Sequence, residues 1–218
     1  MRAAPDLRVY LVTDAAQCRA RGRTVTDTVR AAVAGGATCV QVRAKRADGA
    51  DFLTQVLDVA HAVGRQVPVL VNDRVDVFLA ARRLGAPVAG VHVGQRDLPA
   101  AVVRDLIGDD AYLGLSAATP DELATAQAEG ACDHVGIGAV RATTTKPDAP
   151  AGLGAPGIAR LAAGTDLPCV AIGGVTAADL PALRAGGLAG AAVVSAICLA
   201  GDPRAAARAL RRAWESGQ

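Results

Sequence analysis

The polar residues that are rarest in this chain follow short aliphatic segments. The chain has only two lysines, Lys45 and Lys146, and a single asparagine, Asn72. Two of its three serines, Ser116 and Ser195, are placed in the same way. A lysine ammonium is a compact positive charge that arginine does not replace where an anion or a reacting centre needs a point donor. Turn propensity could explain the asparagine and the serines, but it does not explain both lysines, so the pattern favours an active site.

Two aspartates extend this pattern to a metal site. Asp73 and Asp97 follow two consecutive aliphatic segments, and Asn72 stands beside the first of them. Carboxylate and amide oxygens are hard ligands that suit Mg²⁺, which keeps several waters and shares its ligand shell with phosphate oxygens. The alternative is a pair of loop or helix-capping aspartates. We expect Asp73 and Asp97 to bind magnesium.

A repeated unit of strand and helix must position these residues. Eight aliphatic segments begin roughly 20 to 35 residues apart and alternate with segments of helical length. Each is nearly continuous in aliphatic residues, which is typical of parallel strands that are buried on both faces. The predicted strands are Arg8–Val12, Thr38–Val42, Pro68–Val71, Ala89–Val93, Tyr112–Leu115, His134–Ile137, Pro168–Ile172 and Gly190–Val194.

The segments between the strands are predicted helices, several of which begin with a capping residue and end in glycine. They are Thr26–Ala34, Ala50–Val63, Val75–Leu84, Pro99–Ile107, Pro120–Glu129, Gly157–Ala163, Ala177–Ala185 and Pro203–Trp214. Strict alternation of this kind predicts an α/β fold, a single (β/α)8 TIM barrel with parallel strands that takes up residues 1–218 as one catalytic domain. An open, doubly wound sheet is the structural alternative.

In such a barrel the active site lies at the carboxyl ends of the strands. Gly173 and Gly174 follow the seventh predicted strand, and Val194 and Ser195 follow the eighth. Barrels often bind phosphate at this place through backbone N–H groups and a helix N-terminus, and glycine lets the backbone approach the anion closely. The sequence therefore predicts two anionic sites, one for a metal and a diphosphate near strands two to four, and one for a monophosphate at strands seven and eight.

Candidate bases are scarce in this pattern. No glutamate directly follows a predicted strand, and no Ser-His-Asp or Cys-His arrangement is evident. His61 lies in a predicted helix, and His92 and His134 lie in predicted strands, so we interpret each as a packed or surface residue rather than a catalyst. A site rich in cations, amides and hydroxyls but poor in bases suits a reaction driven by stabilisation of a leaving group.

Composition argues against several classes of protein. With 51% hydrophobic and 20% charged residues, the chain of 218 residues has the make-up of a folded domain. A net charge of +2 and few aromatic residues argue against a nucleic-acid partner. No segment has the length of a membrane span, and residues 1–12 carry no cleavage signature. Five dispersed cysteines suit free thiols, so we expect a cytoplasmic protein, with a homo-oligomer left open.

Seven segments between Tyr10 and Ile197 resemble, in order, the successive motifs of the thiamine-phosphate synthase family. They are GGATCVQVRAK, VNDRVD, GVHVGQRDLP, LGLS, TTTKPD, VAIGGV and AVVSAI. The resemblance implies a Mg²⁺-dependent transferase that joins hydroxymethylpyrimidine diphosphate to hydroxyethylthiazole phosphate and releases pyrophosphate. It also implies that the bond to the diphosphate breaks largely ahead of attack, so that the neutral thiazole nitrogen captures a pyrimidine-stabilised cation.

The resemblance also assigns roles by position. Gln41, Arg43, Lys45 and Asn72 would hold the pyrimidine diphosphate, Asp73 and Asp97 the Mg²⁺, Thr143 and Thr145 the thiazole, and Gly173, Gly174, Val194 and Ser195 the thiazole phosphate. Ser116 and Lys146 would lie near the diphosphate and the reacting centre, and we expect these two, with Arg43 and Lys45, to be the catalytic residues.

The chain departs from the family pattern in two places. Ala118 stands where the family often has histidine, and Ala139, Arg141 and Ala142 stand where it commonly has proline, an aromatic residue and proline. Two rival functions remain, a thiazole tautomerase of related fold and a non-catalytic binder of thiamine precursors. The tautomerase would need the acid–base group that Ala118 lacks. A binder has little need for leaving-group chemistry, so the presence of Asp73, Asp97 and Lys146 argues against it.

Overall fold

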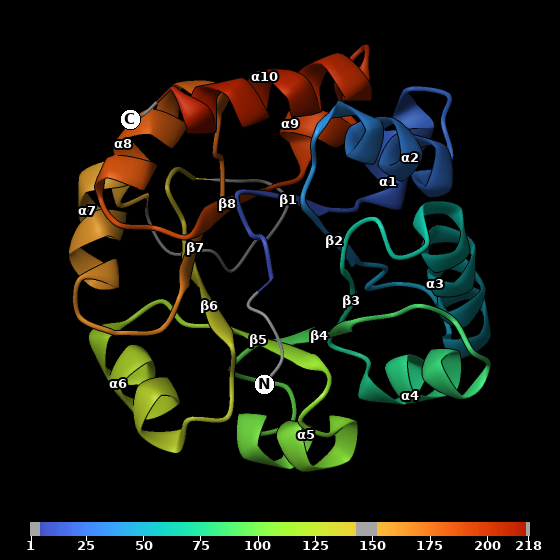
Figure 1. The fold of residues 1–218 in the computed structure, drawn as a ribbon, viewed down its shortest axis with the longest axis horizontal. Coiled ribbons are helices and arrows are strands. Elements are labelled where there is room, and N and C mark those ends of the chain that lie inside the picture. The colour runs from blue at the N-terminus through green and yellow to red at the C-terminus, as the bar shows by residue number, and fades with distance from the viewer. Residues whose placement is uncertain (1–4, 143–151, 217–218) are drawn as a thin grey trace.

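Eight parallel strands form a closed barrel in the computed structural model, which describes residues 5–142 and 152–216 (Figure 1). They are β1 (Val9–Val12), β2 (Cys39–Val42), β3 (Val69–Asn72), β4 (Gly90–Val93), β5 (Tyr112–Ser116), β6 (His134–Gly138), β7 (Cys169–Ile172) and β8 (Gly190–Val193). The strands follow one another around the ring in sequence order, and β8 pairs with β1 to close it. The predicted (β/α)8 barrel is confirmed, and the open sheet is excluded.

Helices surround the barrel on all sides (Figure 1). They are α1 (Ala15–Ala20), α2 (Val25–Gly35), α3 (Gly49–Val63), α4 (Val75–Arg83), α5 (Ala100–Ile107), α6 (Pro120–Glu129), α7 (Gly154–Ala162), the 3₁₀ helix η1 (Ala177–Asp179), α8 (Leu180–Ala185), α9 (Ser195–Cys198) and α10 (Pro203–Glu215). The predicted helix Ala177–Ala185 is divided into η1 and α8, since Pro181 has no N–H to donate to a continuous ladder. Sequence analysis missed α1 and α9, which are too short to show helical periodicity.

Each strand buries side chains on both of its faces, because successive side chains of a strand point to opposite sides. In β1, Val9 and Leu11 pack in the layer between the strands and the helices. Tyr10 and Val12, which alternate with them, belong to a second and smaller apolar cluster inside the barrel. This double burial explains why the strands read as continuous aliphatic segments.

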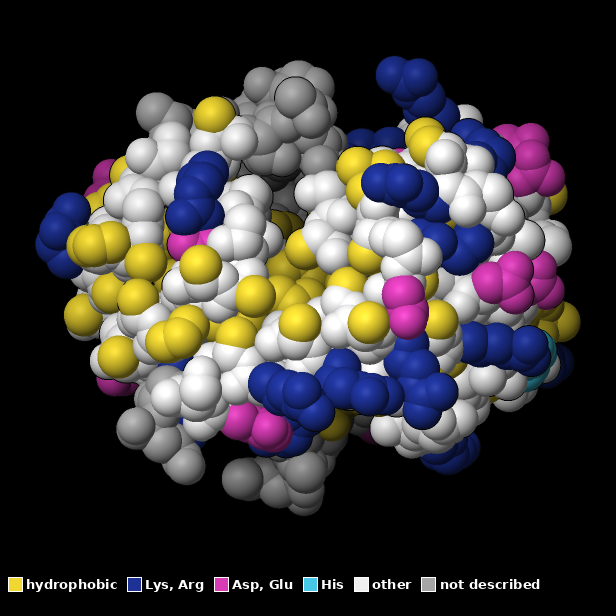
Figure 2. Space-filling view, turned by 90° about the horizontal axis from the view of Figure 1, so that it is seen from above, with side chains coloured by type: hydrophobic (Ala, Val, Ile, Leu, Met, Phe, Trp, Pro, Cys, Tyr) yellow, Lys and Arg dark blue, Asp and Glu magenta, His cyan; other side chains and the backbone are white. Residues whose placement is uncertain are grey.

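Helix α10 covers one side of the barrel with an amphipathic surface. Its residues Ala207, Leu210 and Trp214 are buried, whereas Arg204 and Arg208 are exposed. Figure 2 looks onto this side of the molecule and shows basic side chains gathered in a row. The basic side chains of α10 therefore lie on a solvated helix face. Over residues 5–142 and 152–216, no helix has both the length and the apolar character of a membrane span.

Polar side chains gather inside the barrel among the apolar ones. Gln41 Nε2 donates a hydrogen bond to Tyr10 Oη (2.8 Å). The ring of His134 meets the ring of Tyr10 edge-on, with centroids 6.0 Å apart. The centroid of the His92 ring lies 5.7 Å from that of the His134 ring. Gly114 of β5 makes room for both imidazoles, because a Cβ at this position would collide with His92 Nδ1 and lie 2.5 Å from His134 Nε2.

We expect Gly114→Ala to lower the free energy of unfolding by about 1–3 kcal/mol, because the added methyl group overpacks the two imidazole rings. Chemical denaturation followed by circular dichroism measures this change. Gly201→Ala is the matched control, since a Cβ there meets no atom within 4 Å. Equal stability of the two variants would contradict the tight packing inferred around Gly114.

Candidate active site

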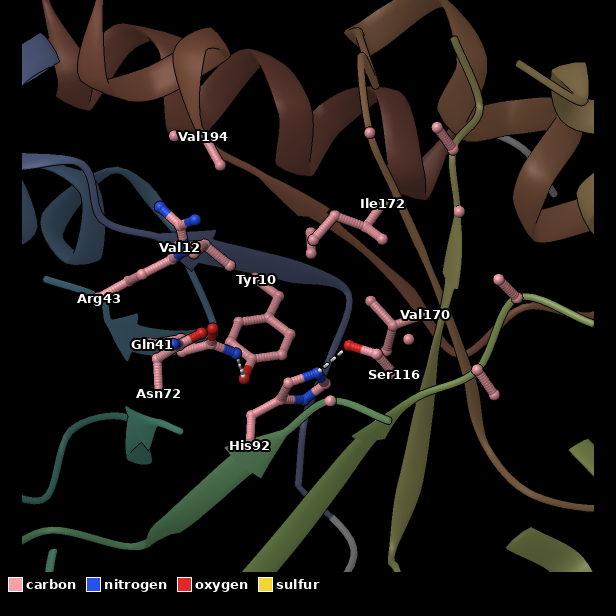
Figure 3. Close-up of a pocket in the computed structure, with 18 of the residues that line it drawn as sticks. Tyr10, Val12, Gln41, Arg43, Asn72, His92, Ser116, Val170, Ile172 and Val194 are labelled. Carbon is pink, nitrogen blue, oxygen red and sulfur yellow. Dashed lines mark hydrogen bonds between the residues drawn. The ribbon is translucent and has the colours of Figure 1, made fainter. Parts of the chain in front are cut away.

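A pocket of about 550 Å³ opens at the carboxyl ends of the strands, and every strand contributes to its lining (Figure 3). All of the predicted site residues that the structure describes line this pocket. They are Gln41, Arg43, Lys45, Asn72, Asp73, Asp97, Ser116, Gly173, Gly174, Val194 and Ser195. The other three, Thr143, Thr145 and Lys146, lie outside the described residues. The fold thus brings residues that are far apart in the sequence to one place.

Asp73 and Asp97 occupy one corner of the pocket, at the ends of β3 and β4. Asp73 has a left-handed backbone conformation (φ 61°), which is uncommon for a residue other than glycine and marks a site under local constraint. Its N–H donates to the carbonyl of His92 (2.8 Å), and the Asp97 carboxylate accepts from the N–H of Gly94 (2.7 Å). Burial, and then the negative charge of Asp97, raise the pKa of Asp73, while the charge of Lys45 opposes this rise.

This corner fits a divalent cation. A cation placed between the two carboxylates would offset the burial and the like-charge repulsion that raise the pKa of Asp73. Residues 5–142 and 152–216 contain no cluster of three or more His, Cys, Asp or Glu side chains that could hold a metal. Mg²⁺ suits such a site, since it is commonly bound by one or two carboxylates and completes its shell with water and substrate phosphate.

Arg43 and Lys45 bring positive charge to the same pocket from the segment after β2. The backbone N–H of Arg43 donates to Thr13 Oγ1 (3.0 Å), and the N–H of Thr13 donates to the carbonyl of Gln41 (2.9 Å). The segment after β1 therefore fixes the start of the segment after β2. Two cations and two carboxylates in one pocket suit a ligand that carries several negative charges and arrives with a metal.

His92 and Ser116 hold each other at the end of β5. His92 Nε2 and Ser116 Oγ share a hydrogen bond of 3.0 Å, drawn as a dashed line in Figure 3. Gln95 Nε2 donates to the carbonyl of Ser116 (2.7 Å). Sequence analysis placed His92 among packed residues, and it is buried, but it also lines the pocket and orients a predicted catalytic serine. Its inward position in the alternation of β4 is the signal that could have identified it.

His134 is the most enclosed polar residue of the pocket floor. Its side chain is fully buried, and neither ring nitrogen has a hydrogen-bond partner among the residues that the structure describes. Burial lowers the pKa of His134 to about 4, so the ring is neutral near pH 7. The interpretation of His134 as a packed residue agrees with this burial. Sequence analysis missed, however, that the imidazole ring also lines the pocket.

A glycine turn closes the opposite side of the pocket. Gly173 and Gly174 follow β7 with φ values of 90° and 68°, which only glycine adopts without strain. Ser195 is the first residue of α9, which follows the neighbouring strand β8. Because α9 has only four residues, its dipole is weak, and the turn and the Ser195 hydroxyl are the better candidates for holding a phosphate.

Ala118, which stands where the family often has histidine, lies close to Glu122 at the start of α6. Ala118 lines the pocket, and Glu122 of α6 lies beside it. Glu122 Oε2 accepts from the N–H groups of Ala118 (2.6 Å) and Thr119 (3.2 Å), as part of a capping box. Sequence analysis missed Glu122 as a pocket residue, but its carboxylate serves the start of α6.

Closed parallel barrels place their reactive groups on the rim where the strands end, and here the charged groups and the glycine turn lie on that rim. The arrangement defines the chain as a barrel enzyme for phosphorylated small molecules. Comparison with known families is more specific. A family model described as thiamine monophosphate synthase matches residues 9–197, and the chain belongs to this family.

Individual relatives agree with this assignment. The chain is 44% identical over 220 residues to a thiamine-phosphate synthase of Corynebacterium efficiens, covering 100% of both chains. It is 44% identical over 207 residues to that of Chloroflexus aurantiacus, covering 94% of this chain and 92% of the relative. A solved thiamine phosphate pyrophosphorylase of Pyrococcus furiosus superimposes with a TM-score of 0.83 at 29% identity, covering 98% of each chain. The resemblance inferred from the motifs is confirmed, and the chain is a transferase of thiamine biosynthesis.

The neutral His134 makes stability depend on pH in a defined direction. The pKa of His134 is about 4 in the fold, below the value near 6.5 of an exposed histidine. The unfolded chain therefore binds more protons between these two pH values, and stability falls as the pH drops from 6.5 towards 4. Above pH 6.5 the contribution is complete, and its loss over the whole window is at most about 3 kcal/mol.

We expect His134→Phe to reduce the slope of unfolding free energy against pH in this window, because the variant has no imidazole at this position to bind a proton. Urea denaturation at several pH values measures the slope. His61→Asn, which removes an exposed histidine of α3, is the control for loss of an imidazole. Identical slopes for wild type and His134→Phe would contradict a neutral, buried His134.

Proposed function

We propose that this pocket carries out the reaction of the family with Mg²⁺ bound between Asp73 and Asp97. The reaction is the condensation of hydroxymethylpyrimidine diphosphate with hydroxyethylthiazole phosphate to thiamine phosphate and pyrophosphate. The observation that carries the proposal is the pocket lining that Asp73, Asp97 and Lys45 share, where burial and the charge of Asp97 raise the pKa of Asp73. Mg²⁺ would pair with the two carboxylates, and the diphosphate would pair with Lys45.

Each predicted site residue has a role in this proposal. In it, the pyrimidine diphosphate is held by Gln41, Arg43, Lys45 and Asn72. The thiazole is held by Thr143 and Thr145, and the thiazole phosphate by Gly173, Gly174, Val194 and Ser195. The diphosphate oxygens, on which charge develops as the diphosphate leaves, accept hydrogen bonds from Lys146, Ser116, Arg43 and Lys45. When bound, Mg²⁺ would neutralise part of that charge and improve the leaving group.

The proposed chemistry needs no proton transfer. The bond between the pyrimidine methylene carbon and the diphosphate oxygen breaks, and its electron pair leaves with pyrophosphate. The thiazole nitrogen then gives its lone pair to the pyrimidine-stabilised cation and becomes quaternary. A pocket floor in which His134 stays neutral supports this chemistry, because it places no second positive charge beside the cation.

Release of pyrophosphate from the two substrates, with and without Mg²⁺, tests the proposed function. A synthase releases pyrophosphate only when both substrates and the metal are present. A thiazole tautomerase interconverts thiazole isomers without releasing pyrophosphate, and a non-catalytic binder retains its ligands without turnover. Either of these results would overturn the proposal.

We expect Asp73→Asn to raise the Mg²⁺ concentration for half-maximal rate by about tenfold or more, because an amide replaces a charged ligand. Asparagine tolerates the left-handed conformation of this position, so the fold is preserved. Initial rates across a Mg²⁺ titration measure the effect. Asp76→Asn, which removes an exposed carboxylate of α4, is the matched control. Wild-type metal dependence in Asp73→Asn would remove this residue from the ligand set.

We expect Lys146→Ala to lower kcat by roughly 100-fold or more, because its ammonium stabilises charge that forms only in the transition state. Lys146→Arg should recover only part of the rate, since a guanidinium does not reproduce a compact point charge. Single-turnover measurements of pyrophosphate release report the chemical step directly. An unchanged rate in Lys146→Ala would show that this lysine has no part in the leaving of the diphosphate.

We also propose that the enzyme works in the cytoplasm. All five cysteines, which are Cys18, Cys39, Cys132, Cys169 and Cys198, are buried free thiols. Thiols that persist without pairing are typical of proteins in a reducing compartment. Fractionation of cells, with detection of the protein in each fraction, tests this location.

A further inference from the structure

An ion pair links the segment after β6 to the segment after β7. Arg141 Nη1 and Nη2 donate to the two carboxylate oxygens of Asp179 at 2.5 and 2.6 Å. The Asp179 carboxyl is almost fully buried, and it also accepts from the N–H and the hydroxyl of Thr176, each at 2.8 Å. A two-pronged bond between guanidinium and carboxylate fixes orientation as well as distance.

The same arginine holds the Gly173–Gly174 turn. The backbone N–H of Arg141 donates to the carbonyl of Gly173 (2.9 Å), and its Nη1 donates to the carbonyl of Gly174 (3.1 Å). A Cβ at Gly174 would lie 2.9 Å from the Cβ of Arg141, so the turn and the arginine are in close contact. Arg141 therefore contacts both residues of the turn and the carboxylate of η1 beyond it.

A glycine turn of this kind depends on outside contacts for its shape. Two successive glycines with positive φ have more backbone freedom than any other pair of residues, and ordering them is costly in entropy. The hydrogen bonds from Arg141 restrict that freedom directly. The guanidinium of Arg141 lowers the pKa of Asp179 to about 2. The carboxylate therefore stays charged near neutral pH.

We propose that Arg141, held by Asp179, is a positioning residue that fixes the Gly173–Gly174 turn for the phosphate of the thiazole substrate. This rests on the proposed function, in which the turn receives that phosphate. The turn offers its backbone N–H groups to the anion only in one shape, and the ion pair maintains that shape before substrate arrives. Arg141 does not touch the reacting atoms.

Steady-state kinetics with each substrate varied in turn test the proposal. We expect Arg141→Ala to raise KM for the thiazole phosphate by about tenfold or more and to leave KM for the pyrimidine diphosphate within about twofold. Asp179→Asn should show the same split to a smaller extent, because the amide still caps η1 while its bond to Arg141 weakens. Arg141→Lys, which loses the fork, should fall between wild type and Arg141→Ala.

A matched control separates this role from general loss of an ion pair. Arg82 of α4 forms a comparable two-pronged pair with Asp110 in the turn between α5 and β5, with Nη2 at 2.7 Å from Oδ2. Arg82→Ala should leave both KM values unchanged. If Arg141→Ala only lowers kcat through a smaller folded fraction, or raises both KM values equally, the positioning role is overturned.

A binding measurement keeps the inference separate from the proposed function. Inorganic phosphate, without Mg²⁺, should raise the Tm of the wild-type protein, and we expect its apparent Kd to increase by about fivefold or more in Arg141→Ala but not in Arg82→Ala. A wild type that binds phosphate in this Arg141-dependent way but releases no pyrophosphate would overturn the proposed function alone. Equal phosphate affinity in wild type and Arg141→Ala would overturn the inference alone.

Discussion

Closure of the sheet through the pairing of β8 with β1 is the constraint on which the rest of the structure depends. A parallel sheet has no exposed edge only when the ring is complete, and because all of its strands run the same way, they end on the same rim. Strands of four or five residues direct only about two or three side chains each into the barrel. In β3, Leu70 fills the interior and Asn72 reaches the pocket. A single ring of short strands thus supplies both a core and a site.

The depth of the pocket separates neutral from charged groups. Tyr10, Gln41 and His134 form a floor that is buried and carries no charge near pH 7, while Lys45 and Asp73 stand at the rim. A buried, uncharged floor strengthens the interaction of the rim charges with an anionic ligand, because little water screens them from below. This division suits a reaction in which a charged group departs and a cation is left behind.

The sequence predicts the barrel well because its strongest signal, eight continuous aliphatic segments, results from burial on both faces of each strand. The same continuity obscures which residues point inward, so His92 and His134 are interpreted as packed or surface residues, although the alternation along β4 would place His92 inward. The rare lysine, asparagine and serine residues identify the rim because the fold places strand ends together. Arg141 and Asp179, however, are 38 residues apart in the sequence, and no local pattern indicates their bond.

The departures at residues 139, 141 and 142 replace one source of stiffness with another. Proline fixes φ in the folded and the unfolded chain alike, whereas the pair of Arg141 and Asp179 acts only once β6 lies beside β7. Ala139 also packs against the turn, since a Cβ at Gly173 would lie 2.7 Å from its methyl group. The segment after β6 and the turn after β7 therefore determine each other's shape. A phosphate bound at the turn, as proposed, would consequently depend on Ala139 and Arg141 as well as on the two glycines.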